Sequence, residues 1–384
     1  MLSKVSSIFL SNKKRFLVYK KLWRKFSKKR QNQLKFLVIL MFITAMSEMV
    51  SLGLVVPFLS ILLNQEILWK NEIIGNILIY LDVNKETNLS LPITVIFILS
   101  TLSSALFRLL NLWFGTLLSQ KIGSELSCQA FDRTLKQPYE NHKNSNSSDL
   151  IVAISNYVIQ SVYGIECVLL LITSCLVLLF LLTTIFIIEA KLSFNIIFIL
   201  GITYLTIASL VSKKLNKNGI FIANSNRNQI KIMQESLGGI RDIIINDKRD
   251  FYNDAFRKID LPLRISLAQN SFIGNFPKFI IEAVAMVGIA VISFSLVGKT
   301  KSVEILPYLG MLALAAQKIL PAIQQIFKSW SGLETQKEFI KKLIVILDQD
   351  ISENEINNIS EKFTFNNCLE FKNVSFRYKK YNKY

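Results

Sequence analysis

The chain has 384 residues, of which 51% are apolar and only 19% are charged, and its mean hydropathy is +0.38. An ordinary soluble domain carries roughly 25% charged residues, so this composition excludes an ordinary soluble protein of two or three domains. The formal net charge of +18 suits either nucleic-acid binding or the basic loops of a membrane protein. Its distribution along the chain favours the membrane protein and predicts no nucleic-acid partner.

Cysteine and histidine, which are common in zinc sites and catalytic centres, are scarce in this chain. The chain has four cysteines, none in a CxxC pair, and His142 is its single histidine. This pattern predicts neither a disulfide framework nor a zinc site. We therefore expect no metal and no catalytic residue in this chain.

Residues 1–35 form a basic N-terminal segment with 12 Lys or Arg, and no acidic residue precedes Glu48. Apolar residues alternate with the basic ones, and no small-residue cleavage site of a signal peptide is present. Two interpretations are open: a helix lying on an anionic lipid surface, or a solvated basic leader.

Six apolar segments are long enough to cross a bilayer, which requires about 20 residues. They are Phe36–Leu63, Leu91–Leu118, Cys167–Ile188, Leu192–Ser212, Phe279–Gly298 and Ile305–Phe327. The predicted fold class is an all-α membrane protein with six long transmembrane helices.

The connections between these segments differ in charge. Residues 64–90, 189–191 and 299–304 contain five Lys or Arg in total, whereas residues 1–35, 119–161 and 213–275 contain 27. Because basic residues stay on the cytoplasmic side, both termini and both long loops are predicted to be cytoplasmic.

Both long loops show helical periodicity, at Leu126–Leu135 and at Gln229–Ile245. Helices that extend into the cytoplasm are therefore predicted, with reversals near Tyr139–Ser148 and Asn224–Met233. The outer loop contains an apolar stripe at Asn71–Leu81, which predicts a short helix on the outer membrane surface.

The composition changes after the last span. Leu333–Leu347 is typical of a charged amphipathic helix, and Asp348–Glu361 is acidic and polar. LEFKNVSFRY at Leu369–Tyr378 alternates as a strand does. A lone strand is not stable, so it is either an edge that seeks a partner or, as we favour, the first strand of a missing domain.

This order of elements resembles the transmembrane domain of an ABC exporter of the six-helix type (type IV). Four motifs are similar to the branch that contains lipid-linked-oligosaccharide flippases and polysaccharide-associated exporters: QPYENH (137–142), ESLGGIRDIIIN (235–246), DLPLR (260–264) and PYLGMLALAAQKILPAIQQI (307–326). The resemblance divides the chain into a basic segment (1–35), a transmembrane domain (36–335), a linker (336–368) and the first strand of a nucleotide-binding domain (369–384).

The sequence departs from that family in its C-terminal part. No G-x-x-x-x-G-K-[ST] motif occurs, and the signature and Walker B motifs are absent too. ATP with Mg would bind only through a nucleotide-binding domain that this chain lacks, so we expect no ATPase activity from the chain alone. Tyr378 matches the family's adenine-stacking aromatic, in an incomplete site. The chain would be a truncated product, the membrane half of a split gene or an engineered fragment.

In the mechanism that the resemblance implies, ATP clamps two ATPase domains together and the cytoplasmic loops transmit this closure. Candidate contacts with the ATPase domain are Tyr139, Glu140, His142, Asn228 and Gln229. The alternative is that these residues form ordinary polar reversals.

Four ionisable residues lie within the predicted spans: Glu48, Arg108, Glu282 and Lys318. Such residues are costly in lipid and usually face a cavity or one another. Arg108 and Lys318 are candidates for the path of an amphiphile with an anionic head. Alternatively, Glu48 and Glu282 neutralise them as structural pairs, and the sequence leaves this pairing open.

The resemblance implies export of a lipid-linked saccharide or another amphiphile, with membrane lipids and this substrate as partners. Six spans are half of the family's usual twelve, which predicts a homodimer, and a separate ATPase subunit is also open. The rivals are a peptide or drug exporter of the same fold and a nonfunctional remnant of a truncated gene. A membrane-embedded transferase is disfavoured, because the spans lack a clustered acidic pair and the chain has one histidine.

Overall fold

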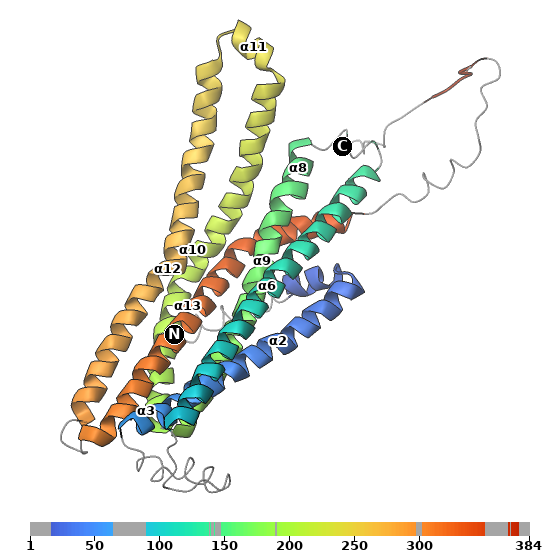
Figure 1. Ribbon diagram of the computed structural model, residues 1–384. Coiled ribbons are helices and arrows are strands. Elements are labelled where there is room, and N and C mark those ends of the chain that lie inside the picture. The colour runs from blue at the N-terminus through green and yellow to red at the C-terminus, as the bar shows by residue number, and fades with distance from the viewer. Residues whose placement is uncertain are drawn as a thin grey trace.

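The computed structural model describes residues 17–63, 90–137, 139, 142, 147–188, 190–296, 302–349, 368 and 370–375. It is a bundle of long helices (Figure 1). The helices are α2 (Lys28–Gly53), α3 (Val55–Leu63), α6 (Ser90–Leu135), α8 (Ser147–Val152), α9 (Val158–Ile188), α10 (Ala190–Gly238), α11 (Ile240–Ile245), α12 (Arg249–Leu296) and α13 (Ser302–Leu347). A π-helical turn, η1 (Ala153–Tyr157), joins α8 to α9, and residues 17–24 form a helical segment before α2.

Four helical runs among the described residues are long and apolar enough to cross a membrane: Lys28–Ile61, Ser90–Leu135, Leu150–Phe186 and Arg249–Gly288. They overlap the first, second, third and fifth predicted spans. The other two predictions, Leu192–Ser212 and Ile305–Phe327, fall on α10 and α13. An all-α membrane protein is confirmed, whereas the count of six spans stays a prediction.

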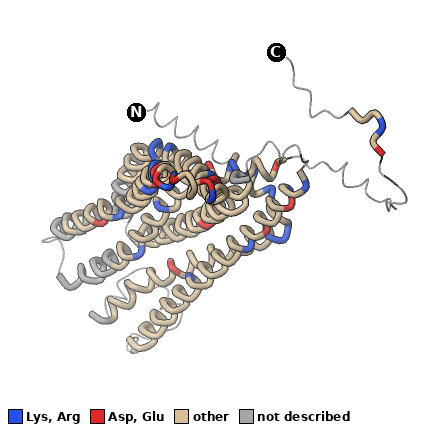
Figure 2. Tube along the Cα trace, turned by 90° about the horizontal axis from the view of Figure 1, so that it is seen from above, with Lys and Arg blue, Asp and Glu red and all other residues tan. Residues whose placement is uncertain are grey.

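The surface of α6 shows why this bundle needs lipid around it. Almost none of its apolar stretch is buried, and Leu99, Leu109 and Trp113 are each more than 60% exposed. Figure 2 shows that long stretches of the helices carry no charged residue. Soluble monomers rarely expose apolar patches of this extent, so the solvent of this surface is the hydrocarbon of a bilayer.

The first predicted span is divided into α2 and α3. Helix α2 ends at Gly53, and α3 begins at Val55. Pro57 lacks the backbone N–H that would bond the carbonyl of Gly53 in a continuous helix. The break between α2 and α3 therefore lies one turn before Pro57. The proline itself is in the first turn of α3, where a backbone N–H would have no partner within the helix.

Helices α10 and α12 form a long antiparallel hairpin with α11 at its tip (Figure 1). Helix α10 has 49 residues, which corresponds to a length of about 70 Å, more than twice the roughly 30 Å of a hydrocarbon core. The hairpin projects beyond the other helices. The prediction that helices extend well outside the membrane is consistent with this length.

The predicted reversal at Asn224–Met233 is wrong, because α10 runs through that segment to Gly238. The chain turns at Gly239, where the backbone leaves helical geometry, and again at Asp247, which has a φ of 50°. The polar side chains that suggested a turn are used between helices instead. Lys342 Nζ donates to Asn224 Oδ1 at 2.8 Å, and Gln229 Nε2 donates to Asp260 Oδ1 on α12 at 2.8 Å.

The other predicted reversal, Tyr139–Ser148, is confirmed in position. Helix α6 ends at Leu135 and α8 begins at Ser147. Beyond η1, Tyr157 is buried against Phe339 of α13, with ring centroids 6.0 Å apart. The chain that returns through α8 and η1 is thereby anchored to α13.

Residues 17–26, which precede α2, are docked on the bundle. Leu22 and Phe26 are buried, and Tyr19 Oη donates to the carbonyl of Leu333 at 3.2 Å. Lys25 Nζ donates to the carbonyl of Leu347, the last residue of α13, at 3.1 Å, and it is ion-paired with Asp348. The N-terminal segment therefore caps the C-terminal end of α13 with a cation, which the helix dipole favours.

Helix α13 continues through residues 336–347, which the sequence assigned to the linker. Phe339, Ile340, Leu343 and Leu347 are almost fully buried in the larger of two apolar clusters. That cluster unites α2, α6, α9 and α13. A smaller cluster lies toward α3 and contains Leu52, Leu181 and Ile319.

No strand is found in residues 370–375, the described part of the predicted Leu369–Tyr378 strand. All six residues are exposed, and no neighbouring strand is available in the described residues to pair their backbone groups. Tyr378, Glu140 and the predicted outer helix Asn71–Leu81 lie outside the described residues.

Candidate functional site

Glu48 of α2 binds two cations from two other helices. Its Oε1 lies 2.8 Å from Nη2 of Arg108 on α6, and its Oε2 lies 2.8 Å from Nζ of Lys318 on α13. Lys318 also donates to Ser51 Oγ at 3.0 Å. This cluster of Glu48, Arg108 and Lys318, hereafter the charge triad, carries two positive charges against one negative charge.

The amphipathic spacing of α2 directs Glu48 into the bundle. Met41, Ala45, Glu48 and Leu52 recur every three or four residues and are all buried. The Glu48 side chain is 2% exposed, whereas that of Arg108 is 61% exposed. The carboxylate is thus hidden behind its two partners, and the guanidinium is the accessible group of the triad.

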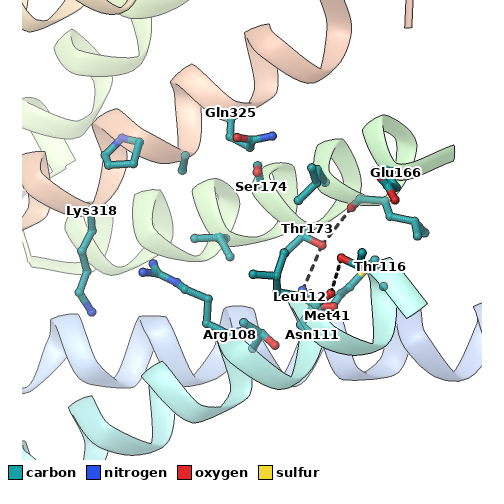
Figure 3. A pocket seen from close by; sticks show the side chains of 17 residues that line it. Met41, Arg108, Asn111, Leu112, Thr116, Glu166, Thr173, Ser174, Lys318 and Gln325 are labelled. Carbon is teal, nitrogen blue, oxygen red and sulfur yellow. Dashed lines mark hydrogen bonds between the residues drawn. The ribbon is translucent and has the colours of Figure 1, made fainter. Parts of the chain in front are cut away.

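A cavity of about 450 Å³ lies beside the triad and is lined by Arg108 and Lys318. Figure 3 shows both side chains at one end of this cavity, with Glu166 at the other end. The volume is within the range of small-molecule sites, roughly 300–1,000 Å³. Met41 and Leu169 of the larger apolar cluster and Val177 of the smaller one also line the cavity, so it occupies the space where the two clusters meet.

One wall of the cavity holds a buried side-chain amide whose oxygen accepts no hydrogen bond from the described residues. Asn111 Nδ2 donates to Thr173 Oγ1 at 3.2 Å, and this contact is visible in Figure 3. Asn111 Oδ1 has no hydrogen-bond partner among the described residues. An unsatisfied buried amide oxygen is costly, so this wall is suited to a ligand or water that donates a hydrogen bond.

The far end of the cavity is acidic. Glu166 of α9 accepts a hydrogen bond from Gln120 Nε2 of α6 at 3.2 Å. Charge along the cavity therefore changes from cationic at the triad to anionic at Glu166. A ligand with one anionic group and neutral hydroxyls beyond it would meet complementary groups in that order.

The fourth ionisable candidate, Glu282, lies apart from the triad. It is on α12, 3.9 Å from Lys278 one turn before it, and it accepts a bond from Gln324 Nε2 at 3.4 Å. The structure thus brings together three of the four predicted residues. Arg108 and Lys318 both pair with Glu48, and both also line the cavity.

The predicted contacts with an ATPase domain lie in two different places. Tyr139 is exposed and His142 is half-buried, both between α6 and α8. Asn228 and Gln229 lie within α10, nine or more residues before its end at Gly238. They lie away from the tip of the hairpin because the chain reverses later than predicted, at Gly239 and α11.

Sequence reasoning missed Ser51, Asn111 and Thr173. Within the predicted spans, only ionisable residues were candidates, whereas these three are neutral. The available signal was the presence of an amide within the apolar segment Leu91–Leu118, because an amide in lipid requires a partner.

The arrangement is suited to binding rather than to bond cleavage. It offers two cations, an amide and hydroxyls in an apolar cavity, and its acidic groups are either bound by cations or at the opposite end.

Residues 54–319, more than half of the chain, match the family described as ABC transporter transmembrane region. This chain therefore belongs to the family of ABC transporter transmembrane regions.

Proposed function

We propose that this chain is the membrane portion of an ATP-driven exporter that moves a lipid-linked saccharide or another amphiphile with an anionic head. Export would run outward across a bacterial inner membrane, through six spans, with both termini in the cytoplasm. The observation that carries the proposal is the excess cation of the charge triad at the cavity.

The physical argument starts from the cost of charge in lipid. A charged side chain in a membrane costs several kcal/mol unless it is paired or hydrated, and only one of the two cations is neutralised by Glu48. An anionic headgroup in the cavity would neutralise the other through a charge-assisted hydrogen bond from Arg108, worth roughly 1.5–3 kcal/mol. Asn111 Oδ1 would accept a hydrogen bond from a sugar hydroxyl.

Energy for transport would come from ATP with Mg on a nucleotide-binding domain, either continuous with this chain or in a separate subunit. A homodimer would supply the twelve spans usual in the family. Contacts with the ATPase domain would lie at Tyr139–His142 and at α11, because the long helices reverse at these two places on the predicted cytoplasmic side.

The test is binding of a fluorescent prenyl phosphate, compared with the corresponding prenyl alcohol, by the purified chain in nanodiscs. Arg108→Gln removes the excess charge and leaves Glu48 paired with Lys318. We expect the dissociation constant for the phosphate to rise about 10- to 100-fold, and that for the alcohol to stay unchanged.

Arg264→Gln is the matched control, because Arg264 is exposed on α12 and paired with Asp260 at 3.2 Å. It should bind both compounds as the wild type does. Equal losses for phosphate and alcohol, or no loss with Arg108→Gln, would refute recognition of an anion by the triad.

A further inference from the structure

A second groove, of about 450 Å³, lies on the outer surface of the bundle between α2 and α6. Its apolar lining comes from both helices: Phe36, Leu37, Leu40, Phe114, Leu117 and Leu118. Phe36 is 69% exposed and Phe114 is 47% exposed. The groove shares no lining residue with the cavity beside the triad.

Polar residues lie at only one end of this groove. Asn32 and Gln33 precede the apolar residues of α2, and Lys121 follows those of α6. Because the two helices are antiparallel, both change from polar to apolar in the same direction. The lining of α2 extends from residue 32 to residue 40, which corresponds to about 12 Å along the helix.

The polar end also carries an excess of positive charge. Lys121 and Lys29 have no carboxylate partner among the described residues, and both are exposed. Lys29 lies one turn before Gln33 on the same face of α2. The nearest acidic residue along that face of α6, Glu125, is occupied by Arg30 Nε at 2.8 Å and by Ser27 Oγ at 3.0 Å.

We propose that this groove binds one anionic phospholipid from the leaflet on the side where α2 begins. Its acyl chain would lie against the apolar walls, and its phosphate would contact Lys121, with Lys29 nearby. Lysine side chains at such a depth extend their ammonium groups to the interface, where an anionic headgroup is attracted by about 1 kcal/mol per basic residue, or about fivefold in affinity.

The occupant is a lipid rather than a free phosphate, because a soluble anion would leave both apolar walls uncovered. It is anionic rather than zwitterionic, because the ammonium of a choline headgroup would meet two lysines and, among the described residues, no available carboxylate. The site is separate from the proposed substrate cavity, so the two can be tested independently.

The experiment uses native mass spectrometry of the purified chain, released from vesicles that contain equal amounts of phosphatidylglycerol and phosphatidylcholine. We expect one phosphatidylglycerol per chain to be retained in preference to phosphatidylcholine. Lys121→Gln should lower this preference about fivefold, and Leu117→Trp should abolish retention of either lipid by filling the groove. Neither change should alter binding of prenyl phosphate at the cavity, which also shows that the variants are folded.

Two control variants lie on α10, outside the groove. Lys214 is exposed, and Leu210 is 71% exposed, so Lys214→Gln and Leu210→Trp match the two test changes in chemistry. Both should retain phosphatidylglycerol as the wild type does. Equal retention of the two lipids by the wild type, unchanged retention by both groove variants, or displacement of the lipid by excess glycerol phosphate would each overturn the proposal.

Discussion

Glu48 is the residue on which the arrangement of charge in this protein depends. It is 2% exposed and contacts a cation with each of its two oxygens. A carboxylate in such a place costs free energy by desolvation, and the two short ion pairs offset that cost. The same contacts hold α2, α6 and α13 at one depth in the bundle.

A substitution at Glu48 should therefore destabilise the protein strongly. We expect Glu48→Gln to lower the free energy of unfolding by about 3 kcal/mol, the lower end of the range for breaking a buried ion pair, because Arg108 still reaches the open cavity. Chemical denaturation in detergent micelles is the measurement.

Glu282→Gln provides the comparison. Glu282 is 44% exposed and its cation is 3.9 Å away, so this change should cost less than about 1 kcal/mol. If the two substitutions lowered the free energy of unfolding equally, the buried ion pairs of the triad would contribute no more to stability than the exposed pair of Glu282.

The ionisable members of the site could be predicted from the sequence, because charges within apolar segments are rare. Their pairing could not, since Glu48 and Lys318 are 270 residues apart and helix rotation decides which faces meet. Asn111 was not found because a neutral amide is a weaker signal than a charge in an apolar segment.

At the scale of helices, a glycine allows α10 and α13 to cross with their backbones close together. A Cβ added at Gly219 of α10 would lie 2.7 Å from the backbone carbonyl oxygen of Thr335 on α13. Because glycine has no side chain, the two backbones can approach this closely. The crossing of α10 and α13 positions the long hairpin relative to the rest of the bundle.

Gly219→Ala should lower the free energy of unfolding by about 1–3 kcal/mol, because backbone atoms cannot move aside as a flexible side chain does. Thermal unfolding in detergent measures this. Gly201→Ala is the control on the same helix, where no atom lies within 4 Å of the added Cβ, and it should be neutral or slightly stabilising. A Gly219→Ala protein as stable as the control would contradict the close crossing.

Helix type and approximate position followed from apolar periodicity, but the reversal between α10 and α12 did not. The polar run around Asn224–Asn228 suggested a turn, whereas its side chains bond to α13 and to Asn156 of η1. Local sequence does not distinguish a polar turn from a polar helix interface. The better signal was the pair Gly238 and Gly239 followed by Asn246 and Asp247, residues that favour turns.

For the whole molecule, we propose that the bilayer crosses the bundle at the level of the charge triad. The exposed apolar surface of α6 supports this position, and the hairpin with α11 then extends away from the membrane (Figure 1). The predicted outer loop Asn64–Ser90 and the α11 tip would lie on opposite sides.

Cysteine labelling in whole cells tests this claim directly. In a variant without the four native cysteines, single cysteines are placed at Asn84, in the predicted outer loop, and at Ser236, which is partly exposed near the α11 tip. A membrane-impermeant maleimide should label the first in intact cells and the second only after permeabilisation. Labelling of both positions in intact cells, or of neither, would contradict a bundle that spans the membrane in this orientation.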